Sequence, residues 1–387
     1  MSISALIAAC VAATLQAETY YQYVARSVAY DSDLTDALSS SNEPLITMES
    51  LQPLASENAA FLDGVIAPHN LSLPSTSAII SVPLLVQITR DWSAGGQIVR
   101  DLTYRPLLQS LIPFLLDIPS PRILVPGSGT GRLAFMLAER LEGAQITALD
   151  PDEHAQIVAN HFLTAGEGDD DDDANAPPPP PAAALPSKVY PSLHISNNWA
   201  QQQHRMAGVE VPDVPIEALR KAGKSANITF AVGELDDNVE QWIQPETFDA
   251  LATCFVLDVL DELPRTLKAL HGLLRPTRGL WVNVGPMEFP RSPTITGAAQ
   301  RPEELQRAVA LTASQFLHLV RQAGFVILEE RLIDGCEYDA LPHQLKRTVR
   351  TCLFFVARPA GAEAAEAPPP DASRGGKRRK GRSKEEL

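Results

Sequence analysis

Seven short apolar runs are separated along the chain by segments with the apolar spacing of amphipathic helices. The runs are rich in Val, Ile, Leu and Phe, which is typical of strands covered on both faces. They span residues 122–126, 145–150, 227–233, 248–260, 279–286, 325–333 and 352–359. The alternation predicts right-handed crossovers and an α/β fold with a doubly wound, mostly parallel sheet. Ligands of such sheets bind at the carboxyl ends of the strands.

Three segments fall outside this alternation. The N-terminus shows helical apolar spacing with no Lys or Arg before its apolar core, which favours an opening amphipathic helix over a signal peptide. An Asp block and a Pro block at residues 165–186, and a polar tail ending in GGKRRKGRSKEEL, have compositions that predict disorder. We therefore expect a helical region over residues 1–110, the main domain over 111–358 with a disordered insertion at 165–186, and a disordered tail over 359–387.

Composition and charge narrow the classes of partner. The formal net charge of −15 disfavours binding to nucleic acid or to anionic membrane surfaces. No apolar run reaches the roughly 18–20 residues of a membrane span. The four cysteines are widely spaced and form no C-x-x-C pair, which argues against a zinc site or a disulfide framework and favours a reducing compartment. We expect a cytoplasmic protein; the basic cluster in the tail leaves a nuclear localisation signal open.

The stretch ILVPGSGTGRLAFML predicts a strand, a glycine-rich turn and a helix that together hold a ligand. Gly127, Gly129 and Gly131 form a G-x-G-x-G, and Arg132 stands where the dinucleotide fingerprint needs its third glycine. Asp150 ends the next strand, where an acidic side chain can accept both hydroxyls of a ribose. This combination favours S-adenosylmethionine over NAD as the ligand. In the alternative interpretation, Asp150 caps the helix that follows.

Several stretches, in order, resemble the carnosine N-methyltransferase (N2227-like) family. They are RDWS with a following Arg and Tyr, VPGSGTGRLA, NHFL, HISNN, TCFVLD and WVNVGP. The resemblance covers roughly residues 80–357, less the insertion. It implies a methyltransferase-type Rossmann fold, seven-stranded with the last strand antiparallel, and S-adenosyl-L-methionine as the cofactor.

The resemblance also implies which residues hold the cofactor. Gln87 and Arg100 would reach the methionine end, where an Arg can clamp the carboxylate; a surface ion pair of Arg100 with Asp101 or a neighbour is the alternative. The three glycines would line the methionine and ribose, and Asp150 stands in place of the family's Glu. Glu234 and Leu235, in GELDD, would lie beside the adenine.

The acceptor side departs from the family. Pro290 stands where the family has a histidine, and Thr348, Val349 and Arg350 stand where it has tyrosines. Asp258, at the end of the fourth strand, matches the family's acid and is our candidate for contacting the methyl acceptor; capping the next helix is its alternative role. His194 and Glu288 are weaker candidates. We therefore expect carnosine itself to be a poor substrate.

The function that follows is N-methylation of a small imidazole-containing molecule or peptide, with no metal ion and no nucleic-acid or membrane partner. A homodimer is left open. Three alternatives remain: a catalytically impaired cofactor-binding interaction module, a methyltransferase with an unrelated small acceptor, and an NAD-dependent oxidoreductase. Arg132 and the lack of a hydride-transfer constellation disfavour the oxidoreductase.

Overall fold

The computed structural model describes twelve stretches of the chain. These are residues 19–28, 45–66, 69, 78–164, 188–215, 227–235, 243–245, 247–260, 263–289, 311–339, 341 and 343–361. Most of the expected opening helix, the insertion at 165–186 and nearly all of the tail lie outside the described residues, as does Pro290.

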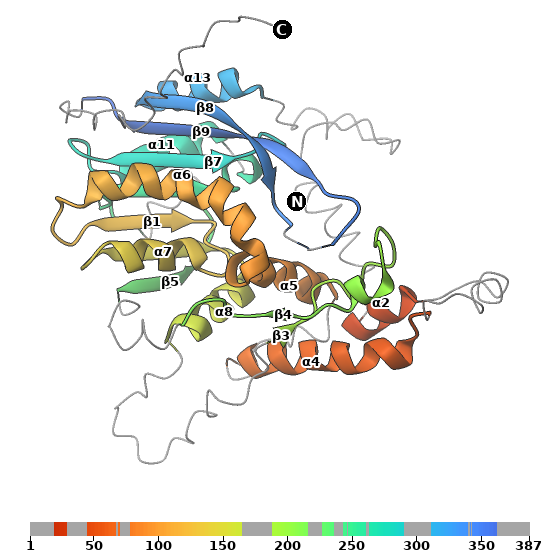
Figure 1. Ribbon diagram of the computed structural model, residues 1–387. Coiled ribbons are helices and arrows are strands. Elements are labelled where there is room, and N and C mark those ends of the chain that lie inside the picture. Colours follow the sequence, from red (N-terminus) through yellow and green to blue (C-terminus); the bar gives the residue numbers. More distant parts are fainter. Residues whose placement is uncertain are drawn as a thin grey trace, which may run out of the picture.

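A seven-stranded sheet forms the centre of the molecule (Figure 1). Its strands are β5 (Ile228–Val232), β2 (Gln145–Asp150), β1 (Arg122–Pro126), β6 (Ala250–Cys254), β7 (Leu280–Gly285), β9 (Val349–Pro359) and β8 (Phe325–Glu337), in this spatial order. All neighbours pair in parallel except β9, which is antiparallel to both β7 and β8. The predicted doubly wound sheet with an antiparallel last strand is confirmed.

Helices cover both faces of the sheet, which explains why its central strands β1, β6 and β7 are apolar and buried. On one face lie α6 (Gln97–Leu115), α7 (Arg132–Arg140) and α8 (Glu153–Thr164), whose apolar side chains share one buried cluster with β1, β2 and β7. On the other face, α11 (Leu263–Leu273) and α13 (Ala313–Gln322) pack around the buried side chains of Trp281 and Phe355. The two clusters are the two hydrophobic layers that a doubly wound fold requires.

A smaller helical layer packs beside the sheet (Figure 1). It contains α2 (Tyr20–Arg26), α4 (Met48–Ile66) and α5 (Ala78–Trp92), joined by a short antiparallel pair, β3 (Lys188–Val189) and β4 (Val209–Glu210). Asn58, buried on α4, fastens the layer: its Nδ2 donates to the hydroxyl of Tyr20 at 2.8 Å and to the carbonyl of Tyr190 at 2.9 Å. The expected boundary at residue 110 falls inside α6, which packs on the sheet.

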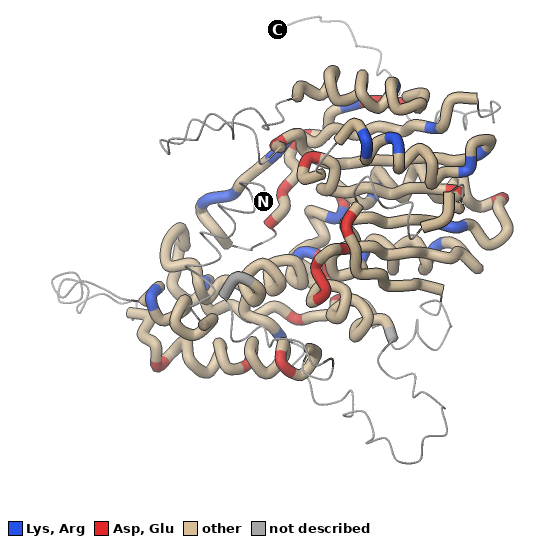
Figure 2. The backbone as a smooth tube through the Cα atoms, turned by 180° about the vertical axis from the view of Figure 1, so that it is seen from behind, with Lys and Arg blue, Asp and Glu red and all other residues tan. Residues whose placement is uncertain are grey.

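The hairpin of β8 and β9 extends past the sheet toward this helical layer (Figure 1). The amide of Leu345 donates to the carbonyl of Asn198 at 2.7 Å, and the rings of His204 and His343 stack 4.4 Å apart. Charged residues are distributed over both the sheet and the helical layer (Figure 2). None of the described helices is long and apolar enough to cross a membrane.

Candidate functional site

A pocket lies at the carboxyl ends of β1, β2 and β6, where the fold is expected to bind its ligand. Its walls come from α5, α6, the glycine turn after β1, the end of β2 and the segment after β6. Tyr338, just beyond the end of β8, closes one side. Segments from α5 to the residue after β8 therefore meet at one site.

The three glycines of the turn have different tasks. All have positive φ, +64° at Gly127, +51° at Gly129 and +82° at Gly131, a conformation that favours glycine. A Cβ at Gly127 would lie 2.9 Å from the side chain of Val256, and one at Gly131 would lie 2.8 Å from that of Ala159. Gly127 and Gly129 line the pocket, whereas Gly131 begins α7 and packs against α8 behind it.

Gln87 and Arg90 face this turn from one side of α5. A Cβ at Gly129 would lie 3.3 Å from Oε1 of Gln87 and 3.6 Å from Nη2 of Arg90. Oε1 of Gln87 is buried and accepts no hydrogen bond from any residue that the structure describes. An unpaired buried acceptor is costly, so a donor from a ligand would relieve it. Gln87 lies in the pocket wall, and its contact with the methionine end of the cofactor stays a prediction.

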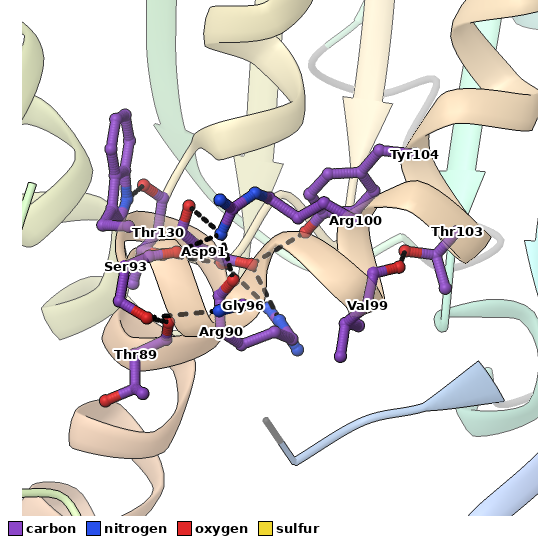
Figure 3. A network of polar contacts seen from close by, with 12 residues as sticks. Thr89, Arg90, Asp91, Ser93, Gly96, Val99, Arg100, Thr103, Tyr104 and Thr130 are labelled. Carbon is purple, nitrogen blue, oxygen red and sulfur yellow. Dashed lines mark hydrogen bonds and ion pairs between the residues drawn. The ribbon is translucent and has the colours of Figure 1, made fainter. Parts of the chain in front are cut away.

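Arg90 is held in position by a buried carboxylate (Figure 3). Its Nε and Nη2 donate to the two carboxylate oxygens of Asp91 at 2.7 and 2.9 Å, a bidentate pair. Tyr104 and Thr130 donate to the same carboxylate at 2.9 and 2.7 Å. Burial by itself would raise the pKa of Asp91, but the charge of Arg90 and these hydrogen bonds lower it below its usual value. Asp91 is thus a fully buried anion with four donors.

The outer surface of Arg90 is turned to the pocket. The guanidinium lies 4.5 Å above the ring of Tyr338, a cation–π contact. Among the described residues, no acceptor is bound to its Nη1. A carboxylate or other anion in the pocket can therefore take that position.

Arg100 lies in a different place from the one expected. Its Nη1 donates to the carbonyls of Arg90, Asp91 and Ser93 at 2.7, 3.2 and 2.9 Å (Figure 3), and its Nη2 donates to Asp213 at 2.6 Å. The side chain is buried and is not among the residues that line the pocket. Arg100 caps the C-terminal carbonyls of α5 and so positions Arg90, which corrects the predicted contact with the ligand. The alternative was a surface ion pair with Asp101 or a neighbour; the structure has instead a buried ion pair of Arg100 with Asp213, while Asp101 pairs with Arg105.

Asp150 ends β2 and lines the pocket, and its contact with a ribose stays a prediction. Its Oδ2 accepts from the amide of Gly129 at 2.7 Å and its Oδ1 accepts from the amide of Asp152 at 2.9 Å. Each carboxylate oxygen can accept a second hydrogen bond, so both remain able to bind hydroxyl donors. The alternative role as a helix cap belongs to Asp152, which accepts from the amides of His154 and Ala155 at the start of α8. Burial raises the pKa of Asp150.

Glu234 and Leu235 lie at the end of β5, beside β2. The amide of Gly233 donates to the carbonyl of Asp150 at 3.1 Å, which ties this segment to the pocket edge. Glu234 is exposed, Leu235 is buried, and neither lines the pocket. Their contact with an adenine stays a prediction.

Asp258 lies beside the pocket. In the sequence it stands between Val256 and Val259, and both of these residues line the pocket. It belongs to the short helix η6 (Leu257–Val259), which follows β6, and it is buried. Its Oδ2 accepts from the amide of Glu288 at 3.2 Å. Burial raises the pKa of Asp258. The helix that Asp258 was expected to cap in the alternative interpretation, α11, begins only at Leu263.

Of the remaining candidates on the acceptor side, Arg350 and Glu288 lie together, whereas His194 lies elsewhere. Arg350 lies with Glu288, its Nε 2.9 Å from Oε1 of that residue. His194 lies in the helical layer against the ring of Tyr23, away from the pocket. Burial lowers the pKa of His194 to about 4, and the nearby charge of Arg205 contributes. His194 is therefore a neutral structural residue at pH 7.

Several pocket residues were not predicted from the sequence, and among them are Arg90 and Tyr338. Arg90 follows Gln87 by three positions, a spacing that places both on one face of a helix, so a signal was present. Tyr338 reaches the pocket only through the pairing of β8 with β9, and nothing in its local sequence indicates that. Among the described residues, no cluster of three or more His, Cys, Asp or Glu has metal-site geometry.

Comparisons with known proteins agree with the motifs. The chain is 24% identical over 311 residues to the carnosine N-methyltransferase of Dictyostelium discoideum, covering 78% of this chain and 60% of that protein. It is 27% identical over 255 residues to that of Schizosaccharomyces pombe, covering 65% and 63%. The chain thus spans about three fifths of the length of these relatives. A solved structure, a putative sarcosine dimethylglycine methyltransferase from Galdieria sulphuraria, superposes with a TM-score of 0.39 at 12% identity, covering 66% of this chain and 85% of that one.

The family profile described as Carnosine N-methyltransferase matches residues 73–360. That range contains the whole sheet, the glycine turn, and α5 from its first residue. The chain belongs to the carnosine N-methyltransferase family.

Proposed function

We propose that this protein is an S-adenosylmethionine-dependent N-methyltransferase whose acceptor is a small imidazole-containing molecule or peptide. The observation that carries the cofactor assignment is the pair of vacant hydrogen-bonding groups on α5. Oε1 of Gln87 is a buried acceptor with no donor in the described part of the chain, and Arg90 presents a guanidinium edge three residues later. An amino acid end, with one ammonium and one carboxylate, satisfies both groups.

The rest of the pocket fits the same ligand. Asp150 keeps acceptor capacity on both oxygens for the two hydroxyls of a ribose, and it lies on the strand next to the glycine turn. Gly127 and Gly129 let the backbone approach the ligand without side chains between. We expect the adenine to lie beyond Asp150, toward Glu234 and Leu235.

Bound S-adenosylmethionine would supply a methyl group already activated on a sulfonium, so the protein needs to align an acceptor nitrogen and exclude water. Val256 and Val259, neighbours of Asp258 in the chain, contribute apolar side chains to the pocket wall, and Tyr338 contributes its ring over Arg90. The carboxylate of Asp258 would orient the acceptor and stabilise the positive charge that develops on its nitrogen.

The imidazole class of acceptor rests on family membership and on the retention of Asp258. Carnosine is expected to be a poor substrate, because Pro290 and Arg350 stand where the family has histidine and tyrosine. A second candidate function, a cofactor-binding interaction module without turnover, draws its support from the same two departures.

Incubation with methyl-labelled S-adenosylmethionine and a panel of histidine-containing dipeptides tests the proposal. We expect label on an imidazole nitrogen, with carnosine poorer than the best dipeptide. Binding of S-adenosylhomocysteine with no transfer to any dipeptide or to a metabolite extract would favour the inactive module. Transfer only to acceptors that lack an imidazole would contradict the proposed acceptor class.

A further inference from the structure

Three charged residues lie together, and one of them is Asp258, the residue that we expect to contact the methyl acceptor. Arg350 lies near the start of β9, Glu288 follows β7, and Asp258 follows β6. They form one cluster: Nε of Arg350 is 2.9 Å from Oε1 of Glu288, and the amide of Glu288 donates to Asp258. We call these three residues the acceptor cluster.

Two members of the acceptor cluster, Asp258 and Arg350, lie near residues that line the cofactor pocket. Val259, the neighbour of Asp258, lines the pocket. Arg350 pairs across the sheet with Cys336, two residues before Tyr338, which also lines the pocket. A molecule that contacts the acceptor cluster can therefore extend into the pocket.

The guanidinium of Arg350 is incompletely paired. Its Nη1 is buried and donates to no described residue, and its Nε lies close to Glu288 without hydrogen-bond geometry. Only 21% of the Arg350 side chain is exposed, whereas 54% of the Glu288 side chain is exposed. A buried guanidinium nitrogen without an acceptor is unfavourable, so an anionic oxygen at this position would stabilise it.

The acceptor cluster contains both signs of charge, so it can bind a zwitterion. One guanidinium stands beside two carboxylates, so the cluster presents a site for an anion and, next to it, a site for a cation. Arg matches a carboxylate with its planar fork, and Asp258 is placed to face a nitrogen that becomes positive.

We propose that Arg350 binds a free carboxylate of the methyl acceptor, so that the acceptor is an amino acid or a short peptide with an unblocked C-terminus. This inference rests on the proposed function and adds the specificity determinant of its acceptor site. A structural ion pair of Arg350 with Glu288 alone would leave Nη1 without an acceptor.

The test compares glycyl-histidine with glycyl-histidinamide, which differ only in the carboxylate. Calorimetric binding is measured to the full chain saturated with S-adenosylhomocysteine, and methyl transfer from labelled S-adenosylmethionine is measured in parallel. We expect the free carboxylate to bind about 10- to 100-fold more tightly than the amide, the range of a charge-assisted hydrogen bond. Arg350→Gln should abolish this difference, and Arg350→Lys should restore part of it.

Two further variants separate specific binding from a general effect. Arg321→Gln removes an exposed Arg of α13 that pairs with Glu330, and it should leave the preference unchanged. Glu288→Gln removes the carboxylate next to Arg350 and should strengthen binding of the free carboxylate severalfold, because repulsion falls.

Each outcome decides the inference. The inference is wrong if the two dipeptides bind equally or if neither binds. It is also wrong if the preference for the free carboxylate persists in Arg350→Gln, or if Glu288→Gln binds the free carboxylate more weakly than wild type. Methyl transfer to both dipeptides without discrimination leaves the proposed function standing while the inference fails. Failure to bind S-adenosylhomocysteine overturns both together.

Discussion

The amide of Gly129 donates a 2.7 Å hydrogen bond to Oδ2 of Asp150, so the glycine turn and the acid at the end of the next strand form one unit. The turn fixes the orientation of the carboxylate, and its other lone pairs face the pocket. A change at either residue should affect ligand binding before it affects the fold.

Asp150→Ala is therefore expected to weaken binding of S-adenosylhomocysteine by about 1–3 kcal/mol, the range for lost hydrogen bonds to a charged group. Isothermal titration of wild type and variant measures the difference. Glu139→Ala, which removes an exposed carboxylate from α7, is the matched control and should bind as wild type does. Equal affinity in the Asp150 variant would exclude the ribose contact.

Arg90 and Arg100 are both buried arginines of one network, but we expect their substitutions to have different effects. Arg90→Lys keeps the charge beside Asp91 and loses the planar fork, so cofactor affinity should fall by about tenfold or more while the fold persists. Arg100→Lys loses several contacts to the carbonyls of α5, so the free energy of unfolding should fall by about 2–4 kcal/mol.

Urea denaturation and calorimetry on the same preparations distinguish the two. The cofactor affinity of Arg100→Lys is measured on the folded fraction. If Arg100→Lys lost more cofactor affinity than Arg90→Lys, Arg100 and not Arg90 would be the residue that binds the cofactor carboxylate.

We expect His194 to contribute to the pH dependence of the free energy of unfolding. Its pKa is lowered to about 4 in the folded protein, against about 6.5 in the unfolded chain. Between these values the unfolded chain binds more protons, so stability falls as the pH falls below about 6.5. From pH 7 to pH 5 the loss should be about 2 kcal/mol.

The measurement is urea denaturation at both pH values for wild type and His194→Gln. The variant should lose about 2 kcal/mol less than wild type over this interval, and His318→Gln, at an exposed position of α13, should behave as wild type. An unchanged pH dependence in His194→Gln would show that this residue is not held neutral.

Asp258→Asn is expected to impair methyl transfer more than cofactor binding. Removing a carboxylate that faces developing charge typically costs about 100-fold in rate. The affinity for S-adenosylhomocysteine should stay within about twofold, because Asp258 lies beside the cofactor pocket and not in its lining. Steady-state rates and titrations on the same variant give both quantities. An Asp258→Asn enzyme as active as wild type would remove this residue from the mechanism.

The sheet could be predicted well because each strand carries its own signal. Residues 122–126 and 145–150 were predicted with the bounds that the structure has, and 248–260 was too long because its apolar run continues into η6. The pair of β3 and β4 was missed, since each strand has only two residues and no periodicity can show in so short a segment.

The site was predicted less completely, for a physical reason. Gly127, Gly129 and Asp150 occupy fixed positions relative to strand ends, so local sequence places them. Whether Arg90 or Arg100 faces the ligand depends on how α5 ends and on Asp213, which comes from a distant loop. Such long-range contacts leave no local pattern, and the same holds for Tyr338.

The central claim is that this pocket holds S-adenosylmethionine. Titration of the purified full chain with S-adenosylhomocysteine and, separately, with NADH tests it most directly. We predict one site per chain for S-adenosylhomocysteine and no measurable binding of NADH. Binding of NADH without binding of S-adenosylhomocysteine would contradict the account.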